Sequence, residues 1–180
     1  MEAAIRVARS LDHPVWDVHN EYRTIRLNVK YYAARLTITE RWNSGMELTL
    51  AATASGSGLA ALSVIKTPVG SVVWGTLTGA AALLSVARPV LKLTERIRKF
   101  EALATGYRLL DHEYRKLEVD LRERQVYDDA LYQRFQRLLD AAKSLDAKNP
   151  DHSLDSPLRA RLMEEVEREL PAKDFFVPEV

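Results

Sequence analysis

Two short stretches of the sequence have the spacing of chemical motifs. Gly56-Ser-Gly58-Leu-Ala-Ala61 matches the dinucleotide fingerprint GxGxxA, but no predicted strand precedes it and no acidic residue follows at about 20 positions. Ser63-Val-Ile-Lys66 matches the SxxK motif of penicillin-binding enzymes, but the companion motifs of that class are missing from the sequence. We therefore interpret both as chance matches.

Residues that bind metals or act as nucleophiles do not form recognisable sets. The four histidines, His13, His19, His112 and His152, form neither HxxxH nor HExxH, and the chain has no cysteine. The lack of cysteine excludes disulfides, thiol nucleophiles and cysteine zinc sites. There is no Walker A motif. The sequence thus predicts that the protein is not an enzyme, with no catalytic residues, no cofactor and no metal site.

The charged residues are distributed very unevenly. The 26 basic and 25 acidic residues give a net charge of +1, so no overall basic field favours a nucleic-acid partner. Residues 48–87, which we call the low-charge segment, carry Lys66 alone, whereas a chain that is 28% charged would place about eleven charges there. Lys66 divides the segment into runs of 18 and 21 uncharged residues, close to the roughly 20 that a membrane-spanning helix needs.

These runs predict a two-helix transmembrane hairpin over residues 47–88, with its turn at Lys66-Thr-Pro68. Ser71, Gly75 and Gly79 recur every four residues and are candidate helix-packing residues, either between the two arms of the hairpin or between copies of the chain in a homo-oligomer. The runs are rich in Ala, Ser, Thr and Gly, which contribute little to insertion. The alternative is a soluble or peripheral interaction protein in which the hairpin is a buried core.

A basic cluster follows the hairpin. It contains Arg88, Lys92, Arg96, Arg98 and Lys99, with Glu95 as its one acid. By the positive-inside rule, this cluster predicts that both termini are cytoplasmic, as in a protein of the bacterial inner membrane. The same cations are suited to anionic lipid headgroups, so the lipid bilayer is the first expected partner.

Helical periodicity dominates the rest of the chain and predicts an all-α fold. Apolar residues form heptad patterns at Val18, Tyr22, Ile25, Val29, Tyr32 and Leu36, and again at Phe100, Leu103, Tyr107, Leu110, Tyr114, Leu117 and Leu121. The two seams are expected to pair as an antiparallel coil within one chain or to pair with equivalent seams of other chains. Further helices are predicted at 129–146 and 156–170, the second opened by Ser156 as cap and Pro157.

The predicted organisation has four parts: an N-terminal cytosolic helix (1–46), the membrane hairpin (47–88), long cytosolic helices (89–146), and a linker, short helix and acidic tail (147–180). Phe175 and Phe176 stand between two prolines in the tail. They are expected either to dock on the helices or to serve as a peptide ligand for a partner.

This arrangement resembles the SLATT family of bacterial two-transmembrane effectors. The resemblance is carried by the charged helix EYRTIRLNVKYYAARLTITERWNSG, the small-residue hairpin, and the basic-edged helix RPVLKLTERIRKFEALATGYRLLDHEY. It covers about residues 10–145. It implies an oligomeric membrane effector of a defence or conflict system that forms a pore or perturbs the membrane. It also implies a trigger from a nucleotide-signalling or sensor partner protein, and it supplies no catalytic residues.

Overall fold

A computed structural model of the protein describes residues 13–55, 92–150 and 155–178, together with positions 72, 75–76, 79–80 and 82–83. The chain divides into two units. One comprises Met1–Arg35 and Lys99–Val180, and the other comprises Leu36–Arg98. We call the first unit the bundle.

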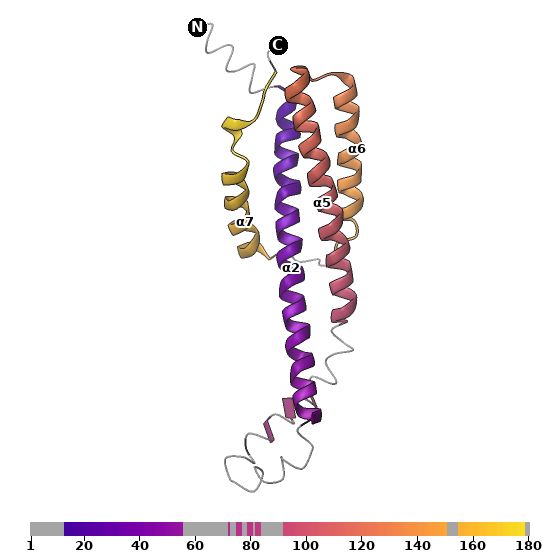
Figure 1. Ribbon diagram of the computed structural model, residues 1–180, viewed down its shortest axis with the longest axis vertical. Coiled ribbons are helices and arrows are strands. Elements are labelled where there is room, and N and C mark those ends of the chain that lie inside the picture. The colour runs from indigo at the N-terminus through magenta and orange to yellow at the C-terminus, as the bar shows by residue number, and fades with distance from the viewer. Residues whose placement is uncertain are drawn as a thin grey trace. The chain divides into compact units, whose positions relative to one another are not determined.

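The described elements are all helical, which confirms the predicted all-α class for this part of the chain. They are α2 (Val15–Ser55), α5 (Leu93–Arg124), α6 (Asp129–Asp146), α7 (Ser156–Glu169) and the short 3-10 helix η1 (Ala172–Asp174). In the bundle the four α-helices pack antiparallel: α5 runs opposite to α2 and to α6, and α7 runs opposite to α2 (Figure 1).

The two heptad seams pair within the chain. Tyr22 stacks on Tyr114 with ring centroids 6.1 Å apart, and Tyr32 stacks on Tyr107 with centroids 5.3 Å apart. Residue numbers rise on α2 as they fall on α5, so the pairing is antiparallel. All seven predicted seam residues of α5 are buried, whereas on α2 Val29 is half-buried. The structure thus favours pairing within one chain over pairing between chains.

The turn between α5 and α6 is built by polar side chains and one left-handed residue. Gln125 has a φ of 60°, a left-handed conformation that glycine usually adopts at the end of a helix. Its backbone N–H donates to the carbonyl of Leu121 at 3.0 Å and closes α5. Asp128 caps α6, since its carboxylate accepts from the Leu131 amide at 2.9 Å. The end of α5 at Gln125 and the cap of α6 at Asp128 together reverse the chain direction, so that α6 runs back along α5.

A glycine and an arginine set the close packing of α5 and α6. A Cβ placed on Gly106 would lie 2.7 Å from a methyl carbon of Leu145, so the glycine that weakens α5 locally also lets the helices approach. Arg134 reaches from α6 to Glu113 at 3.1 Å and to Asp120, both on α5.

Helix α7 begins at Ser156, as predicted, but its cap lies one residue earlier than predicted. Asp155, rather than Ser156, is the cap, because its carboxylate accepts from the Leu158 amide at 3.1 Å while Pro157 occupies the first turn. The Asp155 amide also donates to the hydroxyl of Tyr31 at 3.1 Å, which ties the start of α7 to α2. The choice of cap was wrong because both residues are good caps and only the tertiary contact distinguishes them.

Most of the predicted hairpin at 47–88 lies outside the described residues. Its first part continues α2 through Gly45 to Ser55, and the described positions between 72 and 83 are helical. No helix in the described ranges is both long and apolar enough to cross a bilayer. The domain limits predicted at 47 and 88 stay predictions.

Candidate functional site

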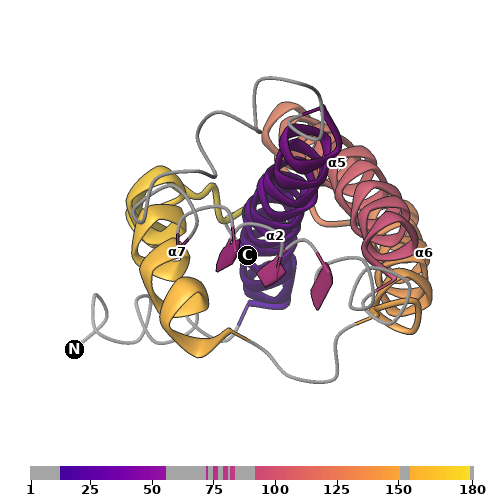
Figure 2. The ribbon, with the colours of Figure 1, turned by 90° about the horizontal axis from the view of Figure 1, so that it is seen from below.

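One flank of α2 holds α7 through charge. Arg23, Arg26 and Lys30 are spaced three and four residues apart, so they share one side of the helix. Helix α7 lies on this side, across α2 from α5 and α6 (Figure 2), and supplies Glu165, Glu167 and Glu169. We call these contacts the ion-pair seam.

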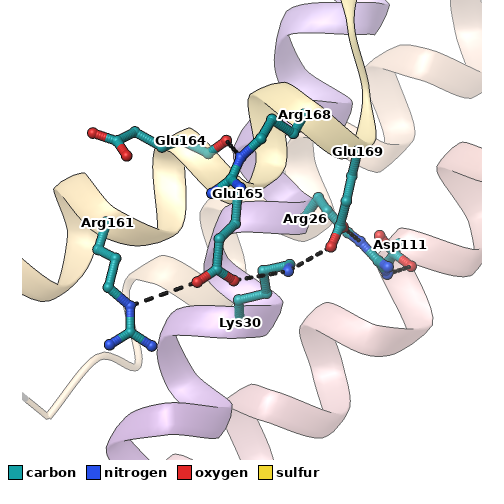
Figure 3. A network of polar contacts seen from close by, with 8 residues as sticks. All are labelled: Arg26, Lys30, Asp111, Arg161, Glu164, Glu165, Arg168 and Glu169. Atoms are coloured by element: carbon teal, nitrogen blue, oxygen red, sulfur yellow. Dashed lines mark hydrogen bonds and ion pairs between the residues drawn. The ribbon is translucent and has the colours of Figure 1, made fainter.

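Arg26 and Lys30 form the centre of the seam (Figure 3). The Arg26 guanidinium bonds to Asp111 Oδ2 of α5 at 3.0 Å and donates from Nε to Glu169 Oε2 at 3.1 Å. Lys30 Nζ donates to Glu169 Oε1 at 2.6 Å and to Glu165 Oε2 at 3.3 Å. Glu169 therefore pairs with two cations. Because Arg26 also pairs with Asp111, the network connects α7, α2 and α5.

The protonation equilibria agree with this geometry. The hydrogen bond from Lys30, and then that from Arg26, lower the pKa of Glu169, while the bond to Glu169 raises the pKa of Lys30. Burial alone would lower the pKa of Arg26, but the carboxylates of Asp111 and Glu169 outweigh it and raise that pKa. Arg26, Lys30 and Glu169 thus stay charged across the neutral range.

Of the two outer pairs, Arg23–Glu167 has the more exposed carboxylate, whereas Arg35–Asp155 is no more exposed than the central pairs. Arg23 meets Glu167 at 2.9 Å, with the glutamate side chain 57% exposed, and Arg35 lies 3.8 Å from Asp155. Ion pairs of this exposure are worth roughly 0–1 kcal/mol each and are screened by salt. The ion pairs therefore attach α7 to α2 only weakly, and salt should weaken this attachment further.

An apolar and aromatic layer completes the attachment. Leu162 and Val166 of α7 are buried. After η1, the ring centroid of Phe175 lies 4.5 Å from that of His19 and 5.8 Å from that of Trp16. Phe175 is 9% exposed, so the expectation that this residue docks on the helices is confirmed.

His19 is a buried imidazole within this layer. It is 2% exposed, and in the described part of the chain neither ring nitrogen has a hydrogen-bond partner. Burial, and then the charge of Arg23, lower its pKa. Since a charged imidazole would be both desolvated and next to a cation, the packed tail favours neutral His19.

A cavity of 520 Å³ lies between α2, α5, α6 and the start of α7, and the residues of the ion-pair seam do not line it. Its walls include Tyr31, Tyr32 and Tyr107, with the carboxyls of Glu21 and Asp146. Burial raises the pKa of Glu21, and in the described ranges that carboxyl has no ion-pair partner. The cavity offers polar groups to water or a small molecule, but the lining residues described contain no paired nucleophile and base.

The predicted helix-packing residues are only partly described. Ser71 lies outside the described residues, whereas Gly75 and Gly79 are helical and exposed. A Cβ on either glycine would meet nothing within 4 Å. Their packing role stays a prediction.

The predicted membrane-edge residues cluster at the start of α5, except Arg88, which lies outside the described residues. Lys92 precedes the helix with φ of 44°, and Arg96, Arg98 and Lys99 lie in its first two turns. Cations near a helix N-terminus oppose the helix dipole. Helix stability therefore does not account for this cluster.

Sequence reasoning missed the ion-pair seam. The signal was present as the spacing of Arg23, Arg26 and Lys30 on a flank of α2 beside the heptad seam, and as the acids of the 156–170 helix. Because charges at helical spacing are usually solvated, the pattern alone does not distinguish a docking face from a surface.

Searches of known protein families, curated proteins and solved structures found no match to this chain. In the part that the structure describes, no group of three or more His, Cys, Asp and Glu residues is placed to hold a metal ion. Function is therefore inferred from the charge distribution, helical periodicity and contacts of the chain itself.

Proposed function

We propose that the protein is a non-catalytic membrane effector of a bacterial defence system. The low-charge segment inserts in the inner membrane, and the helical bundle receives the triggering signal on the cytoplasmic side. The resemblance to SLATT effectors supports this role and a nucleotide-signalling or sensor partner protein.

The observation that carries the proposal is a contact between the two chain boundaries of the bundle. The Arg35 guanidinium lies over the ring of Phe100, 5.7 Å from its centroid; Arg35 is the last residue of the first bundle segment, and Phe100 is the second residue of the next one. A membrane hairpin needs both of its ends on one side of the bilayer, and this contact supports that arrangement. The basic residues at the start of α5 supply the cytoplasmic charge that orients a hairpin.

Assembly of several hairpins would perturb the membrane. Ser71, Gly75 and Gly79 let helices approach closely in lipid, where the hydrophobic effect does not drive association. The same segment contains hydroxyl side chains that can hydrogen-bond to water where several copies gather. They are Ser55, Ser57, Ser63, Ser71, Thr76 and Thr78. A trigger would act on the ion-pair seam, because its pairs are partly exposed and screened by salt.

Membrane potential in cells tests the proposal. Cells that produce the wild type with its trigger present should depolarise and grow slowly, whereas Leu83→Asp should relieve both effects because Asp near the bilayer centre costs ~3 kcal/mol. Leu109→Asp is the matched control, since Leu109 is 66% exposed on the bundle and Leu83 is 76% exposed in the low-charge segment. Equal potential and growth with the wild type and Leu83→Asp, with the wild type in the membrane fraction, would contradict the pore.

A second candidate function is a peripheral all-α interaction protein with the hairpin packed as its core. The composition of residues 48–65 favours it, because Ala, Ser, Thr and Gly dominate that run. Fractionation separates the candidates: release of the protein into the supernatant without detergent would support the scaffold and exclude the membrane effector.

A further inference from the structure

Beyond Arg35, helix α2 exposes large apolar side chains on one face. Ile38 is 40% exposed and Trp42 is 66% exposed. Together with Met46 and Thr49 they line a groove along the helix. The spacing of 4, 4 and 3 residues places these four side chains on the same side of α2.

The acidic residues of this stretch lie on the other side of the helix. At about 100° per residue, Glu40 and Glu47 point roughly 140–160° away from Trp42. Arg41 flanks the apolar face and lines the same groove. Among the described residues no ion pair or side-chain hydrogen bond engages Arg41. The face therefore combines an amphipathic aromatic ring with an available cation.

We propose that this face of α2, from Ile38 to Thr49, docks on the headgroup region of an anionic phospholipid membrane, with Trp42 at the lipid–water boundary. The inference rests on the proposed function and adds a second membrane contact to it, at the entry to the hairpin. Trp rings concentrate at this boundary because one edge is apolar and the indole N–H is polar. An Arg close to an anionic surface gains roughly 1 kcal/mol.

Continuity with the low-charge segment supports lipid as the occupant. Trp42 precedes Leu48, the first residue of that segment, by six positions, or about 9 Å of helix. The headgroup layer on each side of the hydrocarbon core is about 5–7 Å thick. A helix that tilts as it enters the bilayer can thus place this face in the layer while Glu40 and Glu47 stay in water.

Charge argues against a second copy of the chain as the occupant. Pairing of two such faces would bury Arg41 against a surface whose acids point away. An anionic headgroup offers a phosphate to the same guanidinium with favourable geometry. The face therefore suits lipid better than itself.

Single-tryptophan proteins in vesicles of phosphatidylcholine with one third phosphatidylglycerol test this docking. The chain has three tryptophans, Trp16, Trp42 and Trp74. The variant Trp16→Phe/Trp74→Phe keeps Trp42 alone, and two further double variants keep Trp16 or Trp74. A nitroxide on the headgroup should quench Trp42 several-fold more than bromine deep in the acyl chains does. Trp16, in the bundle, should be quenched by neither, and Trp74 by the deep bromines.

The failures of the two claims are distinguishable. If Trp74 is quenched by deep bromine while Trp42 is quenched by neither probe, the docking inference is wrong and the membrane effector stands. If Trp74 is not quenched, the inserted hairpin is wrong, and quenching of Trp42 alone would then leave only a surface contact.

A cysteine probe covers the case in which the double Phe variants fold poorly. The chain has no natural cysteine, so Trp42→Cys can be labelled with nitrobenzoxadiazole, and Ser44→Cys provides the control on the opposite side of the same helix. On adding the vesicles, the emission of the label at 42 should shift to the blue and rise at least two-fold, with little change at 44. No shift at 42, or equal shifts at both positions, would overturn the one-sided docking.

Discussion

The guanidinium of Arg35 lies over the ring of Phe100 with 5.7 Å between the Arg35 Cζ and the ring centroid. The two residues are 65 positions apart in sequence and lie at the two chain boundaries of the bundle. The bundle is therefore formed by the first and last parts of the chain.

The ion-pair seam should be graded in strength. Glu169→Gln removes the charge from a carboxylate that receives both Arg26 and Lys30, whereas Glu167→Gln affects the single pair with Arg23. After allowance for solvent screening at 39% exposure, we expect Glu169→Gln to lower the free energy of unfolding by about 1 kcal/mol and Glu167→Gln by about 0.3 kcal/mol. Urea denaturation measures both, and the difference should shrink in 1 M NaCl. Equal effects, or no salt dependence, would contradict the network.

Acid should loosen the bundle in two steps. The pKa of His19 is lowered in the folded chain, so the unfolded chain takes up the proton first as pH falls. The free energy of unfolding should thus be constant above about pH 6.5 and fall from there toward the folded pKa. The pKa of Glu169 is also lowered, so its contribution is present above its ordinary pKa of about 4.3 and is lost as pH falls through the folded value.

The variant His19→Leu should remove the upper step and leave the lower one. Thermal unfolding followed from pH 8 to pH 3 measures both. If the upper step persists in His19→Leu, another group causes it.

Replacing each of two buried tyrosines by phenylalanine should change the free energy of unfolding in different ways. The Tyr114 hydroxyl is buried without a hydrogen-bond partner in the described part of the chain, whereas that of Tyr107 bonds to Asn28. Tyr114→Phe should leave the free energy of unfolding unchanged or raise it by up to about 1 kcal/mol, because it removes a desolvated hydroxyl. Tyr107→Phe should lower it by about 1 kcal/mol, because it leaves the amide unpaired. The same denaturation assay compares the two, and loss of stability in Tyr114→Phe alone would reverse the assignment.

Much of the bundle follows from the sequence because its pattern is repeated. The α5 seam runs through seven apolar residues at heptad spacing, and each is buried. The docking of α7 was not predicted, because Arg23, Arg26 and Lys30 have the same pattern as a solvated face. Asp155 was likewise missed as the cap because its bond to Tyr31 joins residues 124 positions apart. Long-range contacts of this kind leave no periodic signal.

Gly75 and Gly79 should matter for assembly and not for the single chain. A Cβ on either meets nothing within 4 Å, so Gly75→Leu with Gly79→Leu should leave the melting temperature of the bundle within about 2 °C of wild type. If the glycines seat a neighbouring copy, the same variant should reduce the oligomer size in detergent. Light scattering after chromatography measures that size. An unchanged oligomer would show that the two glycines are incidental.

Extraction of bacterial membranes with alkaline carbonate tests the central claim most directly. Inserted hairpins resist this treatment, whereas proteins held at the surface by charge are released. The account predicts that the wild-type chain stays in the membrane pellet, that Leu109→Asp stays with it, and that Leu83→Asp moves toward the supernatant. Wild-type protein in the supernatant would contradict the membrane effector and leave a peripheral helical scaffold.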